Sequence, residues 1–185
     1  GAVSDFVALF AANRVLVLHG LLALQGRAGI GRAALMKRAV LDRKPTLDCE
    51  DIGFSLAPRL NAAGRLGQAQ LAVELLTTTS QERADMLAEY IDQLNGSRQS
   101  LERSIFTAAK TLAEAQFDAG QDSALVLAER AWPPGVIGIV AGRLAERYPR
   151  PAGVDAPGEM GARPGVGSAR GGPGCAPCPW PPAWP

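Results

Sequence analysis

Several residue types are scarce in this chain of 185 residues, and each scarcity excludes a class of protein. Three cysteines supply neither an even disulfide framework nor a four-ligand zinc site, which predicts a reducing, cytoplasmic compartment. No apolar run approaches the roughly 18 residues of a membrane span, so we expect no membrane association. The net charge of +1 provides no general attraction to nucleic acid, so such a partner would have to be recognised by locally placed arginines.

The remaining composition is typical of a folded protein. Hydrophobic residues make up 47% of the chain and charged residues 20%. The length suits one domain, or the end of one domain and part of the next. The opening sequence, GAVSD, has neither an initiator methionine nor the pattern of a secretory signal. We therefore expect a fragment that begins inside a domain.

Hydrophobic periodicity predicts a mostly helical α/β chain. A buried strand is expected to end within residues 1–10, and Asn13 to cap the first helix. Thr46 is expected to cap a later helix that opens after Pro45. The predicted helices cover residues 14–25, 29–41, 68–76, 80–116 and 135–148, and a strand is predicted within 123–128. From residue 152 onward about half of the residues are proline or glycine, which predicts a disordered or aberrant tail.

The periodic segment from about residue 80 to 116 is unusually long. A helix of some 35 residues extends about 50 Å, which is longer than a compact domain normally needs. We expect this helix to connect two lobes.

Residues 58–66 read PRLNAAGRL and combine charged, amide and small residues next to apolar sequence. Arg59 and Arg65 flank a patch of small residues, and their guanidinium groups, with the Asn61 amide, could bind a phosphodiester on one concave surface. The alternative interpretation is a helix end with Gly64 as its cap and with solvated arginines. Spacing alone does not separate the two.

Residues 132–143, WPPGVIGIVAGR, predict a helix entered through two prolines. The start of such a helix presents backbone N–H groups and the positive end of the helix dipole, which together attract anions. Gly138 and Gly142 lie four residues apart and would leave one face flat. The alternative is that these glycines allow tight packing on a sheet.

Three further features carry weaker signals. Asp5 follows small apolar residues, as metal-ligating carboxylates in α/β enzymes do, although a turn or cap is the more frequent role. His19, the single histidine, lies in an apolar helical stripe and is interpreted as structural. Cys175 and Cys178 have the spacing of a redox pair or half a metal site, but the tail around them favours neither.

In this order, the segments resemble the RecJ family of the DHH phosphoesterase superfamily. Residues 1–7 are similar to the last conserved motif of the family's DHH domain, which implies that Asp5 is catalytic and a metal ligand. Residues 58–66 match a family motif residue for residue. That match implies substrate binding by Arg59, Asn61 and Arg65.

Two later segments extend the resemblance. Residues 132–143 are similar to the opening of the DHH-associated substrate-binding domain, with Pro133 where the family usually has histidine. This similarity implies that the substrate is also bound there. Residues 167–174, GSARGGPG, resemble one more substrate-binding motif. The substrate-binding residues implied by these two segments are Gly135, Val136, Gly138, Arg143, Ser168 and Arg170.

The resemblance also implies a division of the chain. Residues 1–78 would form the C-terminal part of the DHH domain, and residues 79–118 the connecting helix. Residues 119–151 would begin the DHH-associated domain, and residues 152–185 would form the tail.

The implied function is 5′→3′ exonuclease activity on single-stranded DNA, by a monomer, in DNA repair and recombination. Catalysis would use two Mn²⁺ or Mg²⁺ ions about 3.5–4 Å apart. The superfamily's other metal-binding motifs would precede Gly1, and Asp5 alone cannot hold such a pair. We therefore predict that this fragment has no nuclease activity of its own.

Two alternatives remain open at this stage. The first is another DHH phosphoesterase, such as a nanoRNase, a cyclic-dinucleotide phosphodiesterase or a pyrophosphatase. The second is a non-enzymatic helical interaction domain whose glycines serve packing. Placement of Arg59, Arg65 and Arg143 on different surfaces would favour the second.

Overall fold

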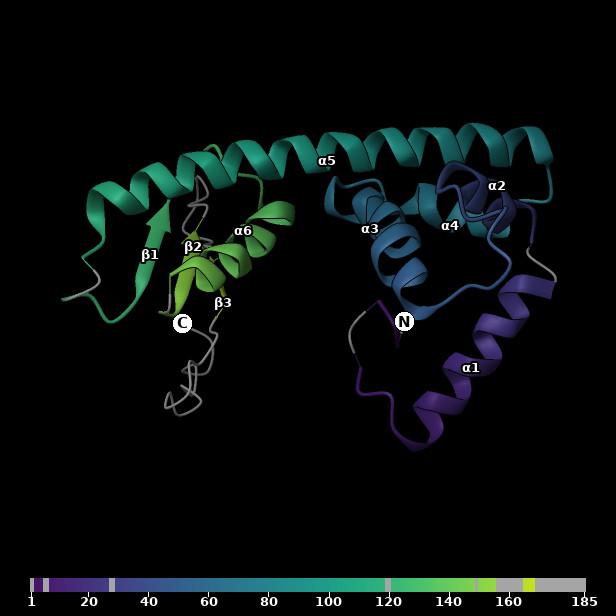
Figure 1. Ribbon diagram of the computed structural model, residues 1–185. Helices are drawn as coiled ribbons and strands as arrows, with labels where there is room; N and C mark the ends of the chain where they lie inside the picture. Colours follow the sequence, from purple (N-terminus) through teal and green to yellow (C-terminus); the bar gives the residue numbers. More distant parts are fainter. Residues whose placement is uncertain are drawn as a thin grey trace, which may run out of the picture. The chain divides into compact units, whose positions relative to one another are not determined.

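The computed structural model describes residues 2–4, 7–26, 29–118, 121–148, 150–155 and, as backbone only, 165–168. The chain divides into two compact units, Gly1–Arg98 and Gln99–Pro185. Helices dominate, and a small sheet lies in the second unit (Figure 1). The mostly helical α/β class expected from the sequence is therefore observed.

The elements follow one another along the chain in this order: α1 (Ala11–Gly26), α2 (Ile30–Arg38), the π-helical turn η1 (Asp51–Leu56), α3 (Ala57–Arg65), α4 (Ala69–Thr77), α5 (Gln81–Gln116), β1 (Leu125–Ala128), α6 (Pro134–Arg147), β2 (Ala152–Asp155) and β3 (Gly165–Ser168).

The core of the first unit lies between α2, α3, α4 and the N-terminal half of α5 (Figure 1). Leu35 of α2, Leu75 of α4 and Ile91 of α5 are almost completely buried there. Helices α2 and α4 meet backbone to backbone, since a Cβ added at Gly31 would overlap the carbonyl oxygen of Leu75. Gly31 thus sets how closely these two helices pack.

A continuous helical run from Cys49 leads through η1 into α3. Its cap is Asp48 and not Thr46, which corrects the prediction. The Asp51 N–H donates to Asp48 Oδ1 at 2.9 Å, and the Asp48 N–H donates to Asp51 Oδ2 at 3.0 Å. This reciprocal pair is a capping box built from two aspartates, a variant that the usual Ser/Thr-to-Glu pattern does not reveal.

The turn just before α3 is wider than an α-helical turn. The Ala57 N–H donates to the Ile52 carbonyl five residues earlier, which is the π-helical pattern. Proline has no N–H, and in a regular α-helix its ring clashes with the carbonyl four residues earlier. We attribute the widened turn to Pro58, because opening the helix here relieves that clash.

The N-terminal region differs from the prediction. Residues 2–4 form a turn and residues 7–10 have no regular structure, so the described part of this segment contains no strand. A strand needs a neighbouring strand for its backbone hydrogen bonds. Asn13 lies inside the first turn of α1, where its amide donates to the Ala8 carbonyl at 3.1 Å, and is not the residue that precedes the helix.

Helix α5 runs without interruption through Gly96. Ser80 caps it, since the Arg83 N–H donates to the Ser80 hydroxyl oxygen at 3.3 Å. The helix predicted over 80–116 is therefore observed with almost the same bounds. Its residues up to Arg98 belong to the first unit and the rest to the second.

In the second unit, a three-stranded sheet of order β1-β2-β3 packs against α6, and both contribute to a core shared with the C-terminal half of α5. Strands β1 and β2 are parallel, and β3 is antiparallel to β2. The β1-α6-β2 connection is a βαβ unit. Leu125 and Leu127 of β1 and Val154 of β2 are buried in this core.

The prediction of a disordered or aberrant tail from residue 152 onward is wrong for two short segments. Ala152–Asp155 and Gly165–Ser168 are strands, whereas residues 156–164 and 169–185 lie outside the described residues. A composition rich in proline and glycine predicts little apolar burial. Strand β2 forms despite this composition, because its backbone pairs with β1 and the small side chain of Ala152 is buried in the core.

None of the helices in the described ranges combines the length and the apolar character needed to cross a membrane.

Candidate functional site

The motif at residues 58–66 forms most of α3 and gives this helix two different sides. Ala62 and Ala63 are completely buried, whereas Asn61, Gly64 and Arg65 are exposed. Asn61 and Arg65 are four residues apart and therefore share a helix face. No atom lies within 4 Å of a Cβ built at Gly64, so there is open space next to this face of the helix.

Arg59 lies on the other side of α3 and is bound within the first unit. Its Nε donates to Asp92 Oδ1 of α5 at 2.8 Å, and its Nη1 donates to the Ser55 carbonyl at 2.7 Å. The Arg59 side chain is only 20% exposed. These contacts tie η1 and α3 to α5.

The structure therefore does not bring Arg59 and Arg65 to one surface. Six residues turn an α-helix through about 600°, so the two Cβ directions are about 120° apart. The prediction that both guanidinium groups face one concave surface is therefore wrong. Asn61 and Arg65 remain together. The roles of Arg59, Asn61 and Arg65 in substrate binding remain predictions.

The alternative role of Gly64 as a helix cap is also corrected. Helix α3 ends at Arg65, and the left-handed residue that follows is Gly67, with φ of 77°. The Gln68 N–H donates to the Ala63 carbonyl at 2.7 Å, which completes a Schellman motif. Gly64 is thus inside the helix, with open space beside it.

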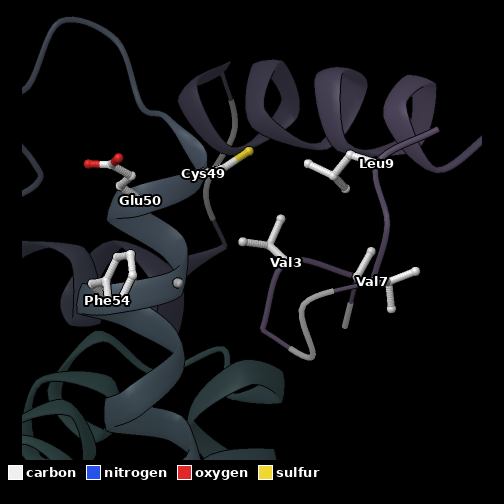
Figure 2. A pocket seen from close by; sticks show the side chains of 8 residues that line it. Val3, Val7, Leu9, Cys49, Glu50 and Phe54 are labelled. Atoms are coloured by element: carbon white, nitrogen blue, oxygen red, sulfur yellow. The ribbon is translucent and has the colours of Figure 1, made fainter. Parts of the chain in front are cut away.

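The N-terminal segment lies against the helical run that leads into α3 (Figure 2). A pocket of about 230 Å³ separates Val3, Val7 and Leu9 from Cys49 and Phe54. Val3 and Val7 are therefore neighbours of the helical run that leads into the arginine motif. Asp5 itself lies outside the described residues.

Helix α6 buries one face and leaves its glycines at the edge of the core. The buried residues are Val136, Ile137, Val140, Ala141, Leu144 and Ala145. Gly138 and Gly142 are half-buried, and a Cβ built at Gly142 would meet nothing within 4 Å. Tight packing on the sheet therefore does not explain Gly142. At the helix start, Pro133 occupies the cap and its carbonyl accepts the Val136 N–H at 3.1 Å.

Arg143 reaches from α6 to α5 within the second unit. Its Nη1 donates to Glu102 Oε1 at 3.0 Å, and its Cζ lies 4.1 Å from the centroid of the Phe106 ring. The Arg143 side chain is 42% exposed and that of Glu102 only 14%. The guanidinium group is therefore held by a carboxylate and an aromatic ring, yet remains accessible to solvent.

The remaining predicted site residues are only partly observable. Ser168 ends β3, for which the structure gives backbone alone, and Arg170 lies outside the described residues. Across the described ranges, no three His, Cys, Asp or Glu side chains gather into a possible metal site. The described residues thus do not fit a resident metal pair.

Sequence reasoning missed the acidic partners of the arginines. Asp92 and Glu102 both lie on α5, among the many charged residues of that helix. Each directly follows an apolar residue that contributes to a core, Ile91 and Leu101 respectively. That position at the edge of the apolar stripe was the only signal, and it does not say which arginine would pair with which carboxylate.

Comparison with known proteins identifies a consistent set of relatives. The chain is 40% identical over 153 residues to a single-stranded-DNA-specific exonuclease of Bacillus subtilis, which covers 82% of this chain and 19% of the relative. It is 37% identical over 171 residues to the corresponding Escherichia coli exonuclease, covering 90% of this chain and 29% of the relative. No family model matches the chain.

Solved structures agree with the sequence comparison. A Thermus thermophilus exonuclease in complex with Mg²⁺ superposes with a TM-score of 0.72 at 32% identity, over 83% of this chain and 23% of that one. A second exonuclease structure, bound to manganese, gives a TM-score of 0.70 at 33% identity, over 83% of this chain and 37% of that one.

By sequence and by fold, the chain is a homologue of exonucleases specific for single-stranded DNA. Each of these relatives is RecJ, so the chain is a RecJ homologue, as the motifs predicted. It spans 19% to 29% of the length of the two curated relatives described above.

Proposed function

We propose that the chain is part of a RecJ-type exonuclease that degrades single-stranded DNA from its 5′ end and acts in DNA repair and recombination. The homology supports the reaction class, and the intact motif at 58–66 supports a role in substrate binding. The protein would act as a monomer in the reducing cytoplasm. The hydrolysis would depend on Mg²⁺ or Mn²⁺, the ions bound in the solved RecJ structures.

The observation that carries the proposed substrate-binding role is the exposed face of α3. Asn61 and Arg65 share this face, and the Asn61 amide and the Arg65 guanidinium both bind phosphate oxygens readily. Gly64, next to this face, has open space beside it and no side chain, so a DNA backbone could approach the helix closely there. Arg59 acts mainly within the protein, where it holds α3 against α5.

The second proposed DNA contact is on α6. The dipole of α6 places partial positive charge at the N-terminal end of the helix, where a phosphate would be stabilised near Gly135, Val136 and Gly138. Arg143 would add a guanidinium from the same helix. Ser168 and Arg170 complete the proposed set, and Asp5 is the proposed catalytic residue and metal ligand.

The boundaries expected from the resemblance are part of this proposal. Residues 1–78 would belong to the DHH domain, residues 79–118 to the connecting helix and residues 119–151 to the DHH-associated domain. The uninterrupted helix at Gln81–Gln116 and the division into two units within it support this assignment.

The proposal is tested by measuring the affinity of the chain for a fluorescent oligothymidylate at several salt concentrations. We expect Arg65→Ala to weaken binding about five- to tenfold and to lower the salt dependence by about one counterion. Arg14→Ala, which removes the same charge from the exposed surface of α1, is the matched control and should change little. Equal effects of the two substitutions would exclude a specific role for Arg65.

A second measurement addresses the reaction. The substitution equivalent to Arg65→Ala, placed in the complete Bacillus subtilis RecJ, should slow 5′ exonuclease digestion of single strands. An unchanged rate would exclude the motif arginine from the reaction. Cleavage of dinucleotides but not of longer strands by the complete parent of this chain would instead support a different DHH phosphoesterase.

A further inference from the structure

We infer that Glu102 of α5 is a positioning residue that orients the Arg143 guanidinium toward single-stranded DNA. This inference rests on the proposed function, since it assigns a partner to one of the proposed DNA contacts. It also gives the C-terminal half of α5 a role beyond connecting two domains.

Three side chains from two helices form the arrangement. Glu102 and Phe106 are four residues apart on α5 and therefore share one helix face. Glu102 accepts a hydrogen bond from Arg143 Nη1 at 3.0 Å, and the Phe106 ring lies beneath the guanidinium carbon at 4.1 Å. The carboxylate fixes one edge of the guanidinium group and the ring covers one of its faces.

This arrangement leaves Arg143 able to bind a further anion. A guanidinium group has five N–H donors, and the contact with Glu102 uses one of them. The Arg143 side chain is 42% exposed, whereas Glu102 is 14% exposed, so the solvent-facing partner is the arginine. A long side chain that is already ordered loses less entropy when it binds phosphate.

A purely structural contact between α5 and α6 would give the same geometry, but the two roles predict opposite effects on DNA binding. Removing the negative charge of Glu102 raises the net charge of the chain by one. Electrostatics alone would then strengthen DNA binding. Loss of positioning would weaken it, because the guanidinium would have to be ordered at the moment of binding.

The experiment compares Glu102→Gln with Glu114→Gln in the chain itself, using an oligothymidylate labelled at its 5′ end. Glu114 lies on the same helix and pairs with Lys110 at 3.4 Å, so its substitution changes the charge equally without touching Arg143. We expect Glu102→Gln to raise Kd about threefold or more, and Glu114→Gln to leave Kd unchanged or lower it slightly. An unchanged or lower Kd for Glu102→Gln overturns the inference.

Arg143→Gln separates this inference from the proposed function. We expect it to raise Kd about tenfold, and we expect Glu102→Gln to have no further effect in the Arg143→Gln background. If Arg143→Gln leaves Kd unchanged, the proposed DNA contact itself fails. If Arg143→Gln weakens binding but Glu102→Gln does not, only the positioning role fails.

Phe106→Leu provides an independent test that keeps the carboxylate in place. It removes the ring beneath the guanidinium, and we expect a smaller rise in Kd, in the same direction as for Glu102→Gln. All affinities are measured at a temperature well below the lowest thermal unfolding midpoint among the variants, so that each variant is folded. A Kd equal to that of the unmodified chain in both Glu102→Gln and Phe106→Leu shows that the contact is structural.

Discussion

Replacing Arg59 by alanine should reduce the stability of the chain more than its affinity for DNA. The structure places this arginine in a network inside the first unit, with Asp92 at 2.8 Å and the Ser55 carbonyl at 2.7 Å. Arg65, from the same motif, is exposed. The two arginines should therefore give opposite patterns of stability and binding when each is replaced.

The expected loss for Arg59→Ala follows from its two hydrogen bonds. A hydrogen bond to a charged group contributes about 1.5–3 kcal/mol when buried, and an exposed ion pair about 0.2–1 kcal/mol. The Arg59 side chain is 20% exposed but that of Asp92 is 38% exposed, so we expect the contribution of this ion pair to lie near that of an exposed pair. With the Ser55 contact included, we expect a loss of about 1–2 kcal/mol.

Urea unfolding followed by circular dichroism measures this loss. In a cycle with Asp92→Ala, the coupling free energy should be about 0.5–1.5 kcal/mol. Arg38→Ala is the matched control, because Arg38 pairs with Glu89 of α5 at 3.0 Å but both side chains are largely exposed. We expect the control to cost at most about 0.5 kcal/mol.

A structural role for Arg59 is refuted if the Arg59→Ala and Arg38→Ala variants are equally stable, or if Arg59 and Asp92 show no coupling free energy. It is also refuted if Arg59→Ala leaves stability unchanged and weakens DNA binding as much as Arg65→Ala. That result would mean that Arg59 faces the substrate and that its contact with Asp92 is incidental.

Two further predictions concern stability. Gly31→Ala should destabilise the chain by about 2–4 kcal/mol, because the new Cβ would overlap the carbonyl of Leu75 and force α2 away from α4. Gly96→Ala is the control: there is open space around Gly96, so this substitution should stabilise the chain by up to about 1 kcal/mol. Similar urea midpoints of unfolding for the two variants would contradict the close packing of α2 on α4. The Asp51 N–H, and next the Lys44 ammonium, hold the pKa of Asp48 below its ordinary value of 3.8, so its stabilising contribution is present above about pH 4 and is lost as the pH falls through the lower folded-state pKa. Urea titrations between about pH 5 and pH 2 should show a smaller fall in the free energy of unfolding for Asp48→Asn than for the unmodified chain. An equal dependence of that free energy on pH in the two proteins would refute the contribution of the Asp48 charge.

Local patterns predicted the helices well, because each depends mainly on residues close in sequence. The long helix at Gln81–Gln116 and the helix at Pro134–Arg147 are observed almost as their periodicity indicated. The strand expected near residues 1–10 is absent from the described part of that segment, and the strand at Ala152–Asp155 was not expected. A strand forms only where another strand accepts its hydrogen bonds, and no local pattern reports that partner.

The sequence by itself determined the family, because the motif at 58–66 specifies residue types at fixed positions. It also indicated which polar residues were unusual. Only the tertiary structure separated Arg59, bound to Asp92, from Arg65 on the exposed face, and paired Arg143 with Glu102 and Phe106. The physical reason is distance along the chain. Arg59 and Asp92 are 33 residues apart and Arg143 and Glu102 are 41 apart, so their contacts depend on how α3 and α6 each pack against α5.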